Sequence, residues 1–162
     1  MNWPARVEPI LARAVPALPG PGALPGGTVF EPKWDGYRVL VYATADGRAQ
    51  LLSRRGTDLT AGFPEIADAV ADVGEDLVID AEVVIHHEGR LDFGALQRRL
   101  GRTGAAARRL AVVEPAHLVV FDLLRRGQRQ LMGEPYSGRR GALEELFTDR
   151  QLGPLALFTS ES

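Results

Sequence analysis

The sequence predicts an α+β domain made of mainly antiparallel sheets flanked by helices. Two kinds of segment support this prediction. Stretches rich in β-forming residues follow one another across short turns, which is typical of antiparallel hairpins. Stretches with apolar residues at helical spacing stand apart from these hairpins. A chain of 162 residues is long enough for one such domain with its own core.

The first 27 residues are expected to contain no long regular element. Proline and glycine recur through them, and both residues interrupt helices and strands. This composition alone is typical of a flexible leader. We expect the folded domain over residues 28–162.

The first half of the domain is expected to contain strands followed by one helix. A short strand at 29–31 precedes strands at 37–43 and 49–54, which are rich in β-forming residues. The Asp46-Gly47 pair predicts a hairpin turn between the last two. Apolar residues at helical spacing then predict a helix at 63–73.

The second half is expected to contain two buried strands and further helices. The strands are the apolar runs 77–85 and 117–124, which only acidic residues interrupt. The other expected elements are a turn at 86–89, helices at 93–100 and 105–110, a charged turn at 125–130, a helix at 137–149 capped by Ser137 that buries Leu143, Leu146 and Phe147, and a last strand at 155–159. In the helix at 93–100, one face is expected to carry Phe93, Leu96 and Leu100, and another Gln97, Arg98 and Arg99.

Composition excludes several classes of protein. The net charge of −2 is not that of a generic polyanion binder, so contacts with nucleic acid must come from local arginine clusters. The absence of cysteine excludes disulfides and thiolate metal sites and fits a cytoplasmic enzyme. No apolar run is long enough to predict a membrane span, and no signal peptide is visible. His86 and His87 are expected to face solvent, because adjacent strand residues point to opposite faces and chelate a metal poorly.

Lys33 is the single lysine among the 19 basic residues. In a chain that otherwise uses arginine, an isolated lysine suggests chemistry that arginine cannot perform. Arginine stays charged in proteins, whereas lysine can lose its proton and attack an electrophile. The ordinary alternative is a surface lysine without a role.

The residues around Lys33 argue for a site. Asp35-Gly36 is a turn signal, and Gly36 has no Cβ to hinder the approach of a ligand to the backbone. Arg38 provides a planar set of donors that suits phosphate or ribose oxygens.

Asp80 and Glu82 place two carboxylates inside an apolar strand. Their spacing of two residues puts them on the same face of that strand. Two interpretations explain this pattern equally well. The strand is an edge strand with a solvated acidic face, or the two carboxylates bind ribose hydroxyls or a divalent cation. The residues by themselves leave both interpretations open.

The string Glu31-Pro32-Lys33-Trp34-Asp35-Gly36-Tyr37-Arg38 resembles the nucleotidyl-acceptor motif of ATP-dependent DNA ligases. RNA ligases and mRNA capping enzymes share its shorter Lys-x-Asp-Gly core. Further strings are similar to the same ligase family, and they are Ser53-Arg54-Arg55-Gly56, Phe63-Pro64-Glu65, Asp80-Ala81-Glu82 with alanine in place of the family's glycine, the run from Asp92 to Arg99, and Phe121-Asp122-Leu123-Leu124. Pro9-Ile10-Leu11-Ala12 looks like the family's entry segment, which implies that residues 1–27 pack on the domain.

The resemblance implies a fold, a role for each matching residue and a reaction. The fold would be part of a nucleotidyltransferase (adenylation) domain. Lys33 would be the nucleophile, Glu31 would contact the edge of adenine and Phe121 its face, Arg38 and Arg54 would face ribose or phosphate, and Glu82 would bind ribose or a metal ion. Taken alone, Arg54 is better explained as a surface arginine on a hairpin, and Phe121 as an ordinary core residue. With ATP and Mg²⁺ as cofactors, Lys33 would take AMP and pass it to the 5′-phosphate of nicked double-stranded DNA, and the nick would then be sealed in repair or recombination.

The family's later motifs are not found among the 162 residues. Complete adenylation domains continue with Glu-Gly-x-x-x-Lys and Lys-x-Lys motifs and an oligonucleotide-binding fold, and a sequence with one lysine contains neither motif. The chain therefore looks like the N-terminal part of an adenylation domain, and a C-terminal ligase region acting in trans becomes a candidate partner. Losing such phosphate-binding lysines costs activity, so we expect weak self-labelling by ATP or none from this chain alone.

Three alternatives stay open at this point. The first is a non-catalytic remnant that binds a nucleotide or a partner chain. The second is an enzyme that forms a Schiff base through Lys33. The third is an RNA ligase or capping enzyme, against which the Asp92–Arg99 string speaks.

Overall fold

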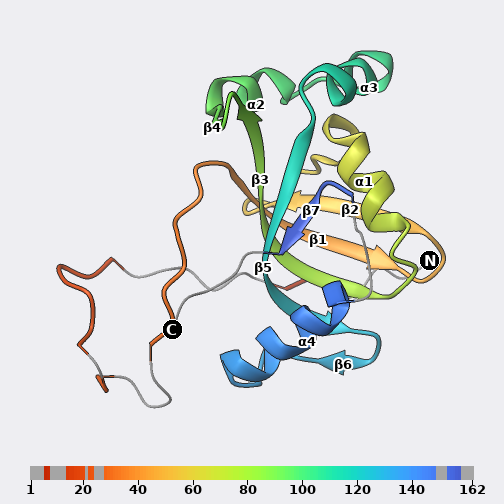
Figure 1. Ribbon diagram of the computed structural model, residues 1–162. Helices are drawn as coiled ribbons and strands as arrows, with labels where there is room; N and C mark the ends of the chain where they lie inside the picture. The colour runs from red at the N-terminus through yellow and green to blue at the C-terminus, as the bar shows by residue number, and fades with distance from the viewer. Residues whose placement is uncertain (1–5, 8–13, 21, 24–27, 149–152, 158–162) are drawn as a thin grey trace.

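A single twisted sheet with helices packed beside it forms the domain (Figure 1). The computed structural model describes residues 6–7, 14–20, 22–23, 28–148 and 153–157. Its strands are β1 (Tyr37–Thr44), β2 (Arg48–Ser53), β3 (Leu77–His87), β4 (Arg90–Leu91), β5 (Ala116–Arg126), β6 (Arg129–Gln130) and β7 (Leu155–Leu157). Its helices are α1 (Pro64–Ala71), α2 (Phe93–Arg99), α3 (Gly104–Val113) and α4 (Tyr136–Thr148), with a short 3₁₀ turn at Thr60–Gly62.

The sheet is antiparallel except at one pair of strands. The strand order is β2-β1-β3-β5-β6, with β4 added beside β3 and β7 running parallel to β5. In Figure 1 the long strands β3 and β5 curve through the centre of the molecule, and they carry most of the pairing. The α+β class with mainly antiparallel sheet is confirmed.

The two faces of the sheet differ in chemistry. Alternate residues of β1 and β3, such as Val41 and Ile79, point into the main core, where α1, α2 and α4 bury apolar side chains against them. The other face holds a smaller apolar cluster around Leu40 and Tyr42. Side chains alternate along a strand, so this second face also receives Arg38, Asp80 and Glu82. The chemistry predicted from the sequence therefore lies on the face away from the main core.

Three local expectations differ from the structure. Residues 29–31 form no strand in the described chain; Val29 and Phe30 are exposed, and the following Pro32 has no N–H to donate. His86 and His87 are the last, exposed residues of β3, and the turn begins at Glu88. Ser137 lies inside α4 instead of capping it, because the helix begins one residue earlier.

The faces of α2 also differ from the prediction. The helix ends at Arg99, and Leu100 continues with an extended backbone. Leu100 is therefore 38% exposed, whereas Arg99 shares the inner face with Ala95 and Leu96 and is 0% exposed.

Part of the N-terminal segment contacts the second face of the sheet. The backbone N–H of Val7 donates to the hydroxyl of Tyr42 over 3.2 Å, and Val7 packs against the smaller apolar cluster. The Pro9–Ala12 string lies outside the described residues, as do the last two residues of the strand expected at 155–159. Within the described residues, no helix combines the length and apolar character that crossing a bilayer requires.

Candidate nucleotide-binding site

The segment that carries Lys33 approaches β3 closely at Gly36. Lys33 is exposed and lies just before β1. A Cβ on Gly36 would overlap the backbone oxygen of Val83 and would lie 2.8 Å from Cγ of Glu82. Only glycine fits this approach, which brings the Lys33 segment against the strand that carries the two carboxylates. The sequence suggested that Gly36 made room for a ligand, but the group it makes room for is β3.

Glu82 is the half-buried carboxylate beside this segment. It lies opposite Arg38 in the pairing of β1 with β3, and the Gly36 backbone donates a hydrogen bond to it. Burial raises the pKa of Glu82 to about 7, although the charges of Arg38 and Lys33 oppose this shift. Glu82 and Lys33 are therefore close enough to interact electrostatically.

Arg38 and Asp80 form a two-pronged ion pair on the same face. Arg38 Nε lies 2.9 Å from Asp80 Oδ1, and Arg38 Nη2 lies 2.6 Å from Oδ2. Asp80 is 3% exposed, and its burial raises its pKa while Arg38 opposes the shift. A buried carboxylate needs such a partner, so the main contact of Asp80 is structural: it fixes the direction of the Arg38 guanidinium.

A β-bulge in β5 aims two consecutive side chains at the same space. Asp80 pairs with Asp122, but the next residue, Ala81, pairs with Val120, so Phe121 is the extra residue. Regular alternation would send Phe121 and Asp122 to opposite faces. With the bulge, both line one pocket, and the Arg38 guanidinium lies 5.6 Å from the centre of the Phe121 ring.

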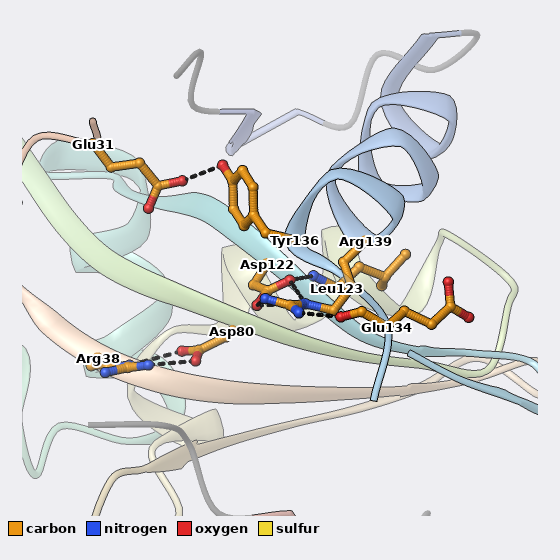
Figure 2. Close-up of polar contacts among 8 residues, drawn as sticks. All are labelled: Glu31, Arg38, Asp80, Asp122, Leu123, Glu134, Tyr136 and Arg139. Atoms are coloured by element: carbon orange, nitrogen blue, oxygen red, sulfur yellow. Dashed lines mark hydrogen bonds and ion pairs between the residues drawn. The ribbon is translucent and has the colours of Figure 1, made fainter. Parts of the chain in front are cut away.

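Helix α4 closes this pocket from the other side. Arg139 donates from Nε and Nη2 to the two carboxylate oxygens of Asp122, each over 2.9 Å. It also donates from Nη1 to the Glu134 carbonyl oxygen over 2.7 Å. The Tyr136 hydroxyl donates to Glu31 Oε1 over 2.7 Å. Figure 2 shows Tyr136 between Glu31 and the Asp122–Arg139 pair, with the Arg38–Asp80 pair below them.

Two hollows meet at Arg38. The first, here called the Phe121 pocket, has a volume of about 260 Å³ and is lined by Glu31, Arg38, Asp80, Phe121, Asp122, Leu124, Met132, Tyr136 and Arg139. The second, here called the Arg54 groove, has a volume of about 740 Å³, and its lining includes Gly36, Arg38, Arg54, Arg55 and Glu82. Arg38 lines both, which makes it the junction between them.

The structure places five of the six residues singled out in the sequence in the lining of these hollows. Glu31 and Phe121 line the pocket, Arg54 and Glu82 line the groove, and Arg38 lines both. Lys33 lines neither of them, but its charge acts on Glu82. Sequence reasoning missed Tyr136 and Arg139. The helix predicted from the sequence begins at Ser137, one residue after Tyr136, and no local pattern connects α4 to Glu31.

The titration of Glu82 gives a measurable pH dependence of stability. Its pKa is about 7 in the folded chain against 4.5 for an ordinary glutamate, so the folded state binds the proton more tightly. The resulting stabilisation is complete at a pH below 4.5 and is lost as the pH rises through about 7. Because Glu82 is partly open to solvent, we expect Glu82→Gln to be more stable than the original chain by only about 1–2 kcal/mol near pH 8.5.

Urea unfolding at about pH 5 and about pH 8.5 measures this difference. Glu88→Gln, which changes an exposed glutamate in the β3–β4 turn, is the matched control and should follow the original chain. An equal loss of stability with pH in Glu82→Gln and in the original chain would show that Glu82 does not titrate in this range.

The chain is similar to known DNA ligases over most of its length. It is 39% identical over 150 residues to DNA ligase C1 of Mycolicibacterium smegmatis, covering 90% of this chain and 42% of that protein. It is 38% identical over 143 residues to DNA ligase C of Mycobacterium tuberculosis, covering 88% of this chain and 38% of that protein. The chain thus spans about two fifths of the length of these relatives.

The fold agrees with these relatives. A solved structure described as mycobacterial DNA ligase D complexed with ATP and MES matches with a TM-score of 0.66 and 32% sequence identity, covering 82% of this chain and 40% of that one. The family model described as ATP dependent DNA ligase domain matches residues 9–159. The chain belongs to the ATP-dependent DNA ligase domain family.

Proposed function

We propose that this chain is the nucleotide-accepting part of an ATP-dependent DNA ligase, and that Lys33 takes AMP from ATP. The observation that carries the proposal is the grouping of Glu31 and Phe121 in the Phe121 pocket, which joins the Arg54 groove at Arg38. The residues proposed to contact the base and those proposed to contact the ribose or phosphate thus lie on one continuous face beside Lys33.

The proposed nucleotide lies across both hollows. A pocket of about 260 Å³ that contains an aromatic ring and a carboxylate suits a purine base. The ribose would pass Arg38, and the phosphates would continue into the more open groove, whose rim carries Arg54 and Arg55. Lys33 is exposed, so no side chain has to move away to admit the α-phosphate.

The proposed reaction follows from a lysine nucleophile. Neutral Lys33 attacks the α-phosphorus through Nζ, a P–N bond forms, the P–O bond to pyrophosphate breaks, and Nζ releases a proton to solvent. An oxygen of the 5′-phosphate of nicked DNA then attacks the same phosphorus, the P–N bond breaks, and Nζ of Lys33 takes up a proton again. The neighbouring 3′-hydroxyl displaces AMP and seals the nick, which is a step of DNA repair and recombination.

The Arg54 groove fits a Mg²⁺ ion that takes one ligand from the protein and the others from phosphate oxygens and water. Within the described residues, no group of three His, Cys, Asp or Glu side chains could hold a metal ion, and Asp80 is occupied by Arg38. Mg²⁺ usually takes one or two carboxylates and completes its shell with phosphates and water, so Glu82 alone is a sufficient protein ligand. When bound there, the ion would neutralise the charge of the departing pyrophosphate.

A C-terminal ligase region is the proposed partner of this chain. Transfer of a phosphoryl group needs several cations around it, and Lys33 is the single lysine in the 162 residues. The relatives are more than twice as long as the matched part. We propose that such a region, from the same polypeptide or from another chain, supplies the remaining cations.

The proposal is tested by incubating the purified chain with α-labelled ATP and Mg²⁺ and separating the products on a denaturing gel. We expect little or no label on the chain alone, and label when the C-terminal region of Mycolicibacterium smegmatis DNA ligase C1 is added. Label on the chain alone would support the nucleophile and contradict the need for the partner region. No label under either condition would contradict the proposal and favour a non-catalytic nucleotide-binding domain.

A further inference from the structure

One hydrogen bond in the Phe121 pocket joins segments far apart in the chain. Tyr136, the first residue of α4, donates from its hydroxyl to Glu31 Oε1 over 2.7 Å, across 105 residues of sequence (Figure 2). A hydroxyl bound to a carboxylate makes one of the stronger hydrogen bonds in proteins. The contact therefore restricts where the Glu31 carboxylate points.

Glu31 needs such a restraint because its own segment provides little. It lies in an exposed stretch without regular structure, between Phe30 and the start of β1. A glutamate there has several rotatable bonds, and ordering it costs conformational entropy. A partner on a packed helix can hold the carboxylate in place before any ligand arrives.

Tyr136 is itself held by the wall of the pocket. The Arg139 guanidinium lies 5.9 Å from the centre of the Tyr136 ring, and two hydrogen bonds to the Asp122 carboxylate hold Arg139 in place. Asp122 follows Phe121 in the bulge of β5. A chain of contacts thus runs from the strand that carries Phe121, through Asp122, Arg139 and Tyr136, to Glu31.

We propose that Tyr136 is a positioning residue that aims the Glu31 carboxylate at the edge of the base in the Phe121 pocket, and so sets a preference for 6-amino over 6-oxo purines. This inference rests on the proposed function. Tyr136 occupies one carboxylate oxygen, and the other can accept an N–H from the exocyclic amine of adenine. Guanine would turn its O6 acceptor toward the same carboxylate, which is repulsive.

The matched pair of variants is Tyr136→Phe and Tyr42→Phe. Each removes one hydroxyl that makes a long-range hydrogen bond, but Tyr42 lies in the smaller apolar cluster and bonds to Val7. We expect Tyr136→Phe to speed amide hydrogen exchange in residues 28–35 and to lower the ratio of ATP to GTP affinity about threefold to tenfold. Tyr42→Phe should change neither quantity.

A double variant separates action through Glu31 from a general effect on the pocket. If Tyr136 acts through the carboxylate, its effect on the affinity ratio should vanish in a Glu31→Gln background, so the two substitutions are not additive. A Tyr136→Phe chain that binds ATP more tightly than the original would instead identify the hydrogen bond as a latch that competes with the base. That result, or an unchanged exchange rate and ratio, would overturn the inference.

The outcomes also separate this inference from the proposed function. An original chain that binds ATP, combined with an unchanged ratio in Tyr136→Phe, overturns only the role of Tyr136. An original chain that binds neither ATP nor GTP at millimolar concentration overturns the proposed function and the base preference together. Faster exchange in residues 28–35 of Tyr136→Phe would still support the restraint on Glu31 in that case.

Discussion

A chain with arginine in place of Lys33 is expected to carry no covalent AMP under any condition in which the original chain is labelled. Arginine keeps the positive charge and similar reach, but its guanidinium holds its proton and is not a nucleophile at neutral pH. Because Lys33 is exposed, the substitution should leave the urea midpoint unchanged. Complete loss of label in a folded chain would therefore report on chemistry and not on stability.

The sequence offers a control of identical composition. The double variant Lys33→Arg with Arg55→Lys keeps the net charge and the single lysine but moves that lysine to the rim of the Arg54 groove. We expect no label on this variant either, measured by the gel assay and by mass spectrometry of the digested protein. Label that persists in Lys33→Arg would place the nucleophile elsewhere, since the 162 residues contain no second lysine.

Replacing Arg99 with leucine is expected to lower the free energy of unfolding by about 3–5 kcal/mol. The guanidinium is fully buried and donates to the Gly62 and Glu114 backbone oxygens at 2.8 and 2.9 Å. It also contacts both oxygens of Glu65 at 2.9 Å. Leucine would leave the Glu65 carboxylate and two carbonyl groups without this partner in a poorly solvated place.

The neighbouring arginine is the control for this change. Arg98 is also on α2 and also forms an ion pair, with Glu114 at 3.0 Å, but its side chain is 58% exposed. Arg98→Leu should therefore cost no more than about 1 kcal/mol in the same urea titration. A loss below that value for Arg99→Leu would show that the Arg99 network contributes little to the stability of the domain.

Local sequence patterns predicted most of the elements. The Asp46-Gly47 pair predicted the turn between β1 and β2, where Gly47 has a φ of 78°. Alternation in β3 correctly placed Asp80 and Glu82 on the same face. These signals lie within a few residues of the structure they specify, so they can be seen without knowing the fold.

The parts that the sequence could not predict depend on packing between distant segments. Arg99 was assigned to a polar face because the helical period was extended to Leu100, but α2 ends one residue earlier. The bulge that brings Phe121 and Asp122 to one side cannot be recognised in the sequence of β5, because it is defined by the pairing of β5 with β3. The contact between Glu31 and Tyr136 exists only because α4 packs beside the end of β5. The residues around Glu31 and those around Tyr136 therefore do not predict it.

A crystal structure of the chain with ATP bound would measure directly where the nucleotide lies. We expect the adenine between the Phe121 ring and the Glu31 carboxylate, the ribose beside Arg38, and the α-phosphorus within reach of Lys33 Nζ. Adenine in the Arg54 groove away from Phe121, or an α-phosphate directed away from Lys33, would contradict the nucleotide-accepting role proposed for this chain.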